Sequence, residues 1–289
     1  SAVLRFHEGN ADSDCAGTTD AGGQLFCSDD HMCVGAIPDY KLCKVSVPAD
    51  GKIPKGALVI GGLFRTSGAN DVNDHTFRQA ADLAAIDFNT NYNVAHVVCD
   101  TAGDAAQAAR AYNVVIDRFG AKVIVGPDTS DEVFAVAKEV VKRGVPIISP
   151  SATNPGITDL MDDGLVWRTA ASDNLQSKVL ATLPLSSSSK IDIIFVGDST
   201  YASGLKDAFV SNFVSLGGTV NASLSFNGGD TAAMNSAVAA ASSDAPAYAL
   251  LLADFDAPPL MAAAAKATGL AMTQFLMTDS AKKPSLWGQ

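Results

Sequence analysis

The most informative part of the chain runs from Val123 to Thr158 and reads VIVGPDTSDEVFAVAKEVVKRGVPIISPSATNPGIT. It contains two short apolar, β-branched runs, Val123–Gly126 and Val145–Ser149, and each ends in turn residues, as strands buried on both faces do. Between them, apolar residues recur at helical spacing and give the segment one buried face. The stretch therefore predicts a strand, a helix and a second strand parallel to the first.

Polar residues follow both predicted strands. They are Asp128, Thr129 and Ser130 after the first strand, and Ser151, Ala152 and Thr153 after the second. Ligands of parallel sheets bind outside the carboxyl ends of the strands. Ser130 and Asp131 also open the predicted helix, whose first N–H groups favour an anion. The pattern predicts a site for a small carboxylate, while the alternative that these residues only cap a helix and form turns stays open.

The string ISPSATNPGIT, preceded by VGPxxS and followed by WRTAASDNLQ, resembles the type I periplasmic binding proteins, in particular the leucine/isoleucine/valine-binding group of ABC-transporter receptors. The resemblance covers roughly Ile53 to the C-terminus and leaves the first fifty residues unmatched. It implies an exported protein whose two lobes close on a small ligand. It also implies a membrane permease as the partner.

The rest of the chain repeats the alternation of strand and helix. Predicted strands lie at 57–63, 95–99, 191–196, 219–226, 248–253 and 274–277, and predicted helices at 77–88, 104–119, 201–216, 231–241 and 258–268. This order is typical of an α/β fold with two doubly wound parallel-sheet lobes. We expect a Cys-rich extension at residues 1–52, lobe one at 53–171 and lobe two at 172–289. The family's return to lobe one after lobe two is expected to be missing.

The resemblance also assigns residues in the second lobe. Tyr201, in DSTYASG, matches a tyrosine that closes over the ligand. Asp279, after FLMT, matches an acidic residue that pairs with the ligand's α-ammonium group. Phe255 or Asp256 falls near an aromatic position of the family. In the alternative interpretation, Tyr201 packs at a helix start and Asp279 is a solvated turn residue.

Cysteine usage predicts an oxidising compartment. Four of the five cysteines lie in the first fifty residues: Cys15, Cys27, Cys33 and Cys43. In a segment too small for its own core they indicate two disulfides, whose connectivity stays open. A zinc site with His31 is the alternative, although no Cys-x-x-Cys pair is present. The fifth, Cys99, lies at a strand end, where we expect it to act as a small buried hydrophobic residue.

Composition and motifs argue against several functions. The net charge of −11 argues against nucleic acid and anionic membrane surfaces as partners, because both would repel an acidic protein. All four histidines lie in the first third, and no G-x-S-x-G, P-loop or H-E-x-x-H motif appears. Gly61-Gly62 does not form the dinucleotide fingerprint. We therefore expect no enzyme, no cofactor and no metal.

Hydroxyls and N–H groups from lobe one would bind a carboxylate, and Asp279 from lobe two would bind an ammonium group. We therefore expect a periplasmic or cell-surface protein that captures an amino acid or a related small polar molecule for an ABC importer. A lipid anchor ahead of Ser1 stays open. The alternative function is a ligand sensor or a scaffold with the same fold. Asp128, where relatives carry an apolar residue, favours a different polar or cationic ligand.

Overall fold

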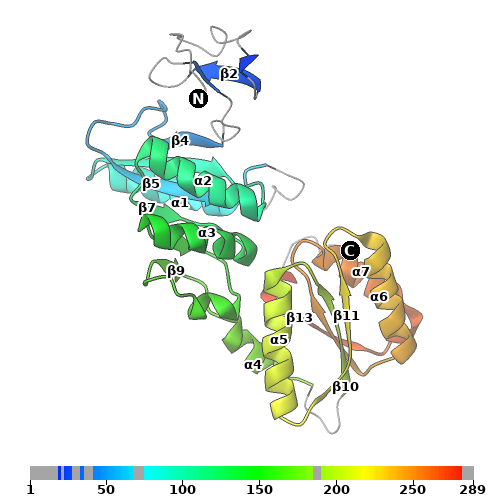
Figure 1. Cartoon of the computed structure of the whole chain (residues 1–289). Coiled ribbons are helices and arrows are strands. Elements are labelled where there is room, and N and C mark those ends of the chain that lie inside the picture. The colour runs from blue at the N-terminus through cyan, green and yellow to red at the C-terminus, as the bar shows by residue number, and fades with distance from the viewer. Residues whose placement is uncertain are drawn as a thin grey trace.

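The computed structural model describes three short strands at residues 19–20, 23–27 and 33–35, and then residues 42–67, 75–184 and 190–281. Figure 1 shows two α/β bodies, which we call lobe one (residues 42–168) and lobe two (residues 173–281). Each lobe has its own sheet and its own hydrophobic core. The predicted fold class is confirmed.

The sheet of lobe one has six strands in the order β4-β6-β5-β7-β8-β9. They are β4 (Cys43–Val47), β5 (Leu58–Phe64), β6 (Val94–Asp100), β7 (Val123–Val125), β8 (Ile147–Ser149) and β9 (Val166–Arg168). All pairs are parallel except β4 with β6 at one edge. The strand order reverses beside β5, and ligands of such sheets bind beyond the carboxyl ends at this switch point.

Helices cover both faces of this sheet. They are α1 (His75–Asn89), α2 (Ala105–Phe119) and α3 (Ser130–Arg143). Gly61 of β5 faces Val115 of α2, whereas Gly62 faces His96, whose ring lies 2.8 Å from the Asp82 carboxylate of α1. Consecutive strand residues point to opposite faces. α1 and α2 therefore pack on opposite sides of β5, where the glycines leave room for them.

Lobe two has a four-stranded, fully parallel sheet in the order β11-β10-β12-β13. Its strands are β10 (Lys190–Val196), β11 (Thr219–Phe226), β12 (Tyr248–Leu252) and β13 (Gln274–Met277). Its helices are α4 (Asp173–Thr182), α5 (Thr200–Ser215), α6 (Thr231–Asp244) and α7 (Ala257–Lys266). α4 packs against α5, and Phe209 and Phe213 stack in the core with ring centroids 5.3 Å apart.

Local sequence fixes where most of these helices begin. In five of them the N-cap side chain accepts a hydrogen bond from a backbone N–H of the first turn: Asp104, Thr129, Ser172, Ser199 and Asp230. Such caps contribute about 1 kcal/mol each. Because the caps follow the strands directly, they place the helix starts at the carboxyl edges of both sheets.

The sheet of lobe one begins earlier than we expected. β4 lies within residues 1–52, which we assigned to the extension, and it pairs with β6. Val45 and Val47 are the β-branched residues of a short strand, a signal that the cysteine pattern obscured. The three N-terminal strands form a separate antiparallel sheet in the order β1-β2-β3: β1 (Thr19–Asp20), β2 (Gly23–Cys27) and β3 (Cys33–Gly35).

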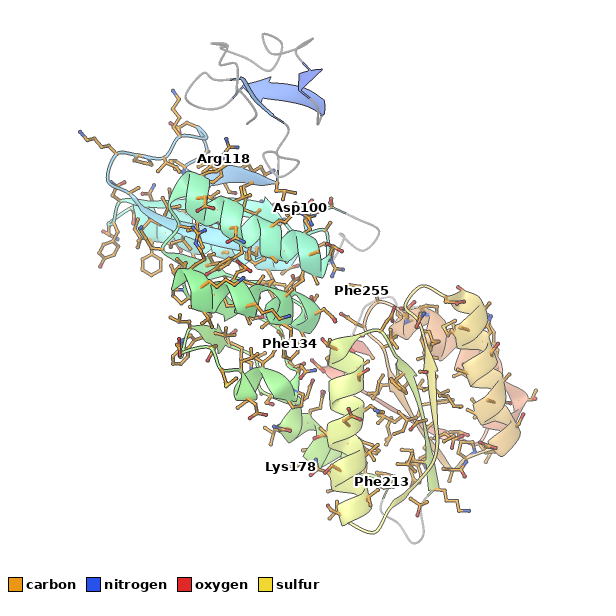
Figure 2. The ribbon with its side chains drawn as sticks, in the orientation of Figure 1. Asp100, Arg118, Phe134, Lys178, Phe213 and Phe255 are labelled. Atoms are coloured by element: carbon orange, nitrogen blue, oxygen red, sulfur yellow. A yellow bond between two sulfur atoms is a disulfide. The ribbon has the colours of Figure 1, made fainter. Side chains whose placement is uncertain are left out.

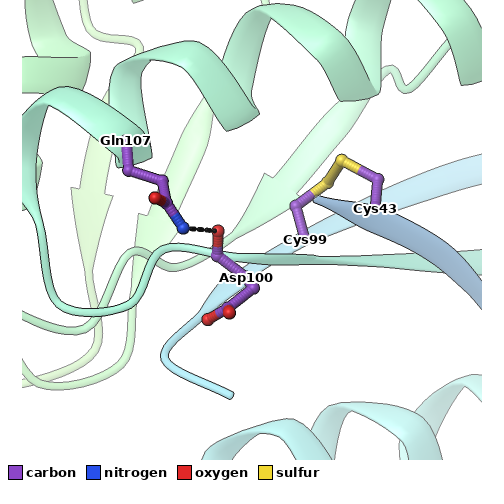
Figure 3. The surroundings of a disulfide bond; sticks show 4 residues. All are labelled: Cys43, Cys99, Asp100 and Gln107. Atoms are coloured by element: carbon purple, nitrogen blue, oxygen red, sulfur yellow. Dashed lines mark hydrogen bonds between the residues drawn. A yellow bond between two sulfur atoms is a disulfide. The ribbon is translucent and has the colours of Figure 1, made fainter. Parts of the chain in front are cut away.

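The cysteine prediction was wrong in its pairing. Cys43 and Cys99 lie opposite each other in the β4–β6 register and form a disulfide (Figure 3). The four early cysteines therefore do not form two bridges among themselves, Cys99 is not a lone buried residue, and Cys43 is not a zinc ligand. The physical reason is the antiparallel edge pairing, which brings residue 43 beside residue 99. Cys27 and Cys33 occupy opposite positions in the backbone register of β2 and β3, and Cys15 lies outside the described residues.

Candidate ligand-binding cleft

A cleft of about 740 Å³ lies between the strand ends of the two lobes. All eight residues that we predicted for the site lie in its wall: Thr129, Ser130, Ser151, Ala152, Thr153, Tyr201, Phe255 and Asp279. Five of them come from lobe one and three from lobe two. The two groups of loops, far apart in the sequence, therefore face one space.

The start of α3 forms one part of the lobe-one wall. Thr129 is its N-cap and makes a capping box with Glu132: its Oγ1 accepts from the Glu132 N–H and donates to Glu132 Oε2 at 2.8 Å. Ser130 is buried, and its Oγ accepts from the Asn154 N–H at 3.2 Å. The Thr129 side chain is thus held by Glu132 and the Ser130 side chain by the Asn154 N–H. Both line the cleft at a helix N-terminus, whose dipole favours an anion.

The loop after β8 forms the other part of this wall. Ser151 Oγ donates to the Asp128 carbonyl oxygen at 2.6 Å, which ties the β7 and β8 loops together. Ala152 is buried, and its N–H donates to Ser149 Oγ. Thr153 Oγ1 donates to Asp173 Oδ2 at 2.8 Å. The predicted hydroxyls are therefore present, and each is already engaged in holding the loop.

Tyr201 lies in the first turn of α5 in lobe two. Its hydroxyl lies 2.8 Å from Thr278 Oγ1 and 3.1 Å from Ser280 Oγ, both in the loop after β13. Burial raises the pKa of the Tyr201 phenol, so the hydroxyl stays protonated at neutral pH. The ring forms part of the cleft wall and braces the loop that carries Asp279.

Asp279 follows β13 and presents an exposed carboxylate to the cleft. Its Oδ1 accepts a hydrogen bond from Gln176 Nε2 of α4 at 2.8 Å. One donor leaves most of the acceptor positions of a carboxylate open. Asp279 is therefore placed to accept hydrogen bonds from an ammonium group across from the lobe-one loops.

Arg65 and Phe255 meet across the cleft. The Arg65 guanidinium carbon lies 4.2 Å from the centroid of the Phe255 ring, a cation–π contact between lobes. Figure 2 shows Phe255 on the side of lobe two that faces lobe one. Arg65 is only 5% exposed, so its side chain is buried and not solvated at the surface. Its contact with Phe255 connects the β5 loop of lobe one to the β12 loop of lobe two.

A second contact between the lobes is made by Asn154, Asp131 and Thr200. Asn154 Nδ2 donates to the Thr200 carbonyl oxygen at 2.6 Å, and the Thr200 N–H donates to Asp131 Oδ1 at 3.2 Å. Both lobe-one side chains thus hold the first residue of α5. Asn154 is 7% exposed and packs on Gly204, whose missing side chain makes the space for it.

We predict that Gly204→Ala weakens this contact. The new β-carbon would overlap Asn154 Nδ2 and lie 2.9 Å from its Cγ, so the Asn154–Thr200 hydrogen bond should break. The expected loss is about 1 to 2 kcal/mol in the free energy of unfolding of the two-lobed protein, measured by urea unfolding. Gly204→Ala combined with Asn154→Ala removes the clash and should lose no more than Asn154→Ala alone; a larger loss would contradict the packing argument.

Asp173 is a buried carboxyl directly behind the cleft. It is 1% exposed, lies in the first turn of α4 and accepts from Thr153 Oγ1. Burial raises its pKa to about 6, opposed by the Thr153 hydrogen bond and increased further by the charge of Asp279. The Arg168 charge acts in the opposite direction. Asp173 therefore changes charge just below neutral pH, next to two of the predicted site residues.

This shift predicts a pH dependence of stability. The folded protein holds the Asp173 proton up to about pH 6, whereas the unfolded chain releases it near pH 3.8. Between these values the folded state binds more protons, so the contribution to the free energy of unfolding falls as the pH rises. Asp173→Asn keeps an acceptor for Thr153 and should raise that free energy at pH 7.5 by roughly 1 to 3 kcal/mol.

The measurement is urea unfolding of wild type and Asp173→Asn at several pH values. The gain should shrink toward zero as the pH falls from 6 to 4. Asp159→Asn changes an exposed aspartate at the end of a 3-10 helix (Pro155–Asp159). It is the matched control and should give no such trend. A gain that is independent of pH would contradict the raised pKa.

Sequence reasoning missed three residues that organise the site: Asp131, Asn154 and Asp173. Asn154 lies inside the quoted SATNPGIT string, and the Asn-Pro pair is a turn signal that we did not use. Asp131 was assigned only to a helix start, and its contact with Thr200 depends on how the lobes meet. Nothing in the sequence shows that Asp173 is buried.

Within the part of the chain that the structure describes, no helix is long and apolar enough to cross a membrane. The same residues contain no group of three or more His, Cys, Asp or Glu side chains arranged to hold a metal ion. The described residues that line the cleft supply hydroxyl and carboxylate groups, together with the cation–π contact of Arg65 and Phe255.

Comparison with known proteins identifies the family. The family model described as periplasmic binding protein matches residues 57–288, about four fifths of the chain. A curated relative, the Leu/Ile/Val-binding protein BraC3 of Rhizobium johnstonii, is 33% identical over 144 residues, which are 49% of this chain and 35% of the relative. The chain thus spans about a third of the length of that protein.

Solved structures show the same fold. The leucine-binding protein LivK from Thermotoga maritima aligns with a TM-score of 0.71 and 22% identity, over 80% of this chain and 65% of that chain. A solute-binding protein of an ABC transporter from R. palustris, in complex with benzoate, aligns with a TM-score of 0.68 and 19% identity, over 77% of this chain and 62% of that chain. The family-model match, the two-lobed fold and the cleft between the strand ends agree, and the chain belongs to the periplasmic binding protein family.

Proposed function

We propose that this protein captures an amino acid or a related small polar molecule in the cleft between its lobes. The observation that carries the proposal is the placement of all eight predicted residues around one cleft. The start of α3 favours a carboxylate, while Asp279 on the opposite wall favours an ammonium group. A ligand with both groups satisfies both lobes.

Binding of the ligand would favour closure of the two lobes around it. A charged ligand group loses water when the cleft closes, and this is favourable only if a partner of opposite charge is in place. The Arg65–Phe255 and Asn154–Thr200 contacts already join the lobes near the cleft. A ligand that bridges the walls would favour the closed arrangement over the open one, as in hinge closure.

We further propose that the loaded protein delivers its ligand to the permease of an ABC importer. The BraC3 relative and the R. palustris transporter protein support this role. The Cys43–Cys99 disulfide supports an oxidising compartment, in the periplasm or at the cell surface. A lipid anchor would tether the protein there, and labelling of the expressed protein with a fatty-acid analogue would detect it.

One observation favours a second function. The strands β1 to β3 lie outside the matched residues 57–288 and form a sheet of their own. An added module of this kind suits a sensor or scaffold that contacts another protein through it. Deleting the module distinguishes the two functions: transport by a permease should persist in a pure transport receptor, whereas signalling or assembly should be lost in a sensor or scaffold.

The test of ligand capture is thermal unfolding of the purified protein against a panel of amino acids, benzoates and other small polar solutes. A ligand at about one hundred times its dissociation constant adds roughly 2.7 kcal/mol to the free energy of unfolding. We expect a selective shift with one class of amino acid. A cooperative melt that no solute moves would overturn the capture proposal and favour the scaffold.

A further inference from the structure

The wall of the cleft is strongly acidic. Among the described residues that line it, the charged ones are one arginine and seven aspartates: Arg65, Asp104, Asp128, Asp131, Asp198, Asp254, Asp256 and Asp279. The formal charge of these side chains is therefore 1 − 7 = −6. A neutral ligand that displaces water from this wall would leave the carboxylates with less solvation and no added partner.

Two of these carboxylates are fixed next to each other in lobe two. Asp198 Oδ1 accepts from the Gly228 N–H at 2.9 Å, and Asp256 Oδ1 accepts from the Gly229 N–H at 3.2 Å. A β-carbon on Gly228 would lie 3.4 Å from Asp256 Oδ2 and 3.7 Å from Asp198 Oδ1. Both side chains therefore converge on one turn, which holds two like charges together at the cleft. Such a pair favours a cation between them.

Like the carboxylates, most of the lobe-one hydroxyls in the cleft wall can only accept hydrogen bonds from a ligand. Thr129 donates its proton to Glu132, Ser151 to the Asp128 carbonyl and Thr153 to Asp173. A hydroxyl has one proton to donate, so these three offer only lone pairs to a ligand. Ser130 differs, because its oxygen accepts from the Asn154 N–H and its proton remains for a carboxylate. The wall thus offers few donors and many acceptors.

From these three observations we infer that the ligand is a basic amino acid, with one carboxylate and two positive groups. This inference rests on the proposed capture function. The carboxylate lies at Ser130 and the start of α3, the α-ammonium group lies at Asp279, and the side-chain ammonium or guanidinium group lies at the Asp198–Asp256 pair. An organic cation is favoured over a metal ion, because the described residues provide no metal-binding group of three or more ligands.

Calorimetric titration of the purified protein with matched ligands tests the inference. L-lysine and L-norleucine differ by the terminal ammonium group, so the pair isolates the predicted second charge. L-arginine, L-leucine and benzoate complete the series. We expect lysine or arginine to bind about 10-fold to 100-fold more tightly than norleucine. This preference should decrease as the salt concentration rises.

A double variant locates the second charge. Asp198→Asn with Asp256→Asn keeps oxygen acceptors for the Gly228 and Gly229 N–H groups and removes two charges, so the fold should persist. It should bring lysine and norleucine to within about 3-fold of each other. Asp207→Asn, an exposed residue of α5 outside the cleft wall, should preserve the preference.

The outcomes separate this inference from the capture function. If norleucine, leucine or benzoate binds as tightly as lysine and arginine, the basic ligand class is wrong while capture stands. If none of the five ligands binds to the folded protein, the basic-amino-acid inference is overturned, and the wider solute panel then decides whether capture itself fails. A lysine preference that survives the double variant would overturn the placement of the side-chain cation at Asp198 and Asp256.

Discussion

Asp279→Ala should weaken ligand binding by about 100-fold or more while leaving the protein folded. Asp279 lines the cleft. In the proposed binding mode its carboxylate accepts from the ligand's α-ammonium group, and closure would bury the pair. Removing one partner of a desolvated, hydrogen-bonded charge pair typically costs about 2 to 5 kcal/mol of binding free energy. Because Asp279 is exposed and follows the last strand, its loss should change the free energy of unfolding little.

Calorimetric titration with the solute that gives the largest thermal shift measures this effect. Asp207→Ala removes an exposed aspartate of α5 outside the cleft wall and should bind as wild type does. Asp279→Asn keeps the acceptor for Gln176 and should lose affinity nearly as strongly as alanine, because the charge is absent. Wild-type affinity in both Asp279 variants would show that the ammonium group binds elsewhere.

Removal of the Cys43–Cys99 bridge should lower the free energy of unfolding by about 4 kcal/mol. The bridge joins residues 56 apart in the sequence, and closing a loop of that length in the unfolded chain gives an entropic stabilisation of about this size. It also fastens β4, an edge strand that pairs with β6 alone, to the sheet of lobe one (Figure 3). We therefore expect the Cys43→Ala/Cys99→Ala variant to unfold at markedly lower urea concentration.

Urea unfolding of the wild type and of the double variant is compared without reducing agent, so that any other disulfides stay intact. Wild type treated with a reductant should move toward the variant, whereas the variant should move less. A loss below about 1 kcal/mol in the double variant would mean that β4 is held by packing and backbone pairing. In that case the disulfide would be incidental to the stability of lobe one.

Much of the fold was predictable because its signals are local. Short β-branched runs followed by caps placed most strands and helices of both lobes to within a few residues, but not β4, β9 and α4; for example, β11 and β13 have the bounds that we predicted. β4 was missed although Cys43, Val45 and Val47 alternate with polar residues, because the cysteine pattern led us to assign these five residues to the extension. β9 was missed because it has only three residues and none of them is buried.

The site was predictable as far as strand ends determine it. Parallel sheets place ligands beyond their carboxyl ends, so the sequence alone predicts Ser130 and Ser151 as site residues, and both line the cleft. What could not be predicted is how the lobes meet. The Arg65–Phe255 contact joins residues 190 positions apart. The contact of Asn154 with α5 depends on the space that Gly204 leaves by having no side chain. Likewise, the pairing of Cys43 follows from an edge-strand register that the cysteine spacing does not encode.

We propose above that one small solute binds between the lobes and contacts both. A crystal structure of the protein grown with the solute that gives the largest thermal shift tests this most directly. We expect the solute to lie in the cleft, with an ammonium group within hydrogen-bond distance of Asp279 and a carboxylate at the start of α3. A saturating solute bound outside the cleft, or contacting one lobe alone, would contradict it.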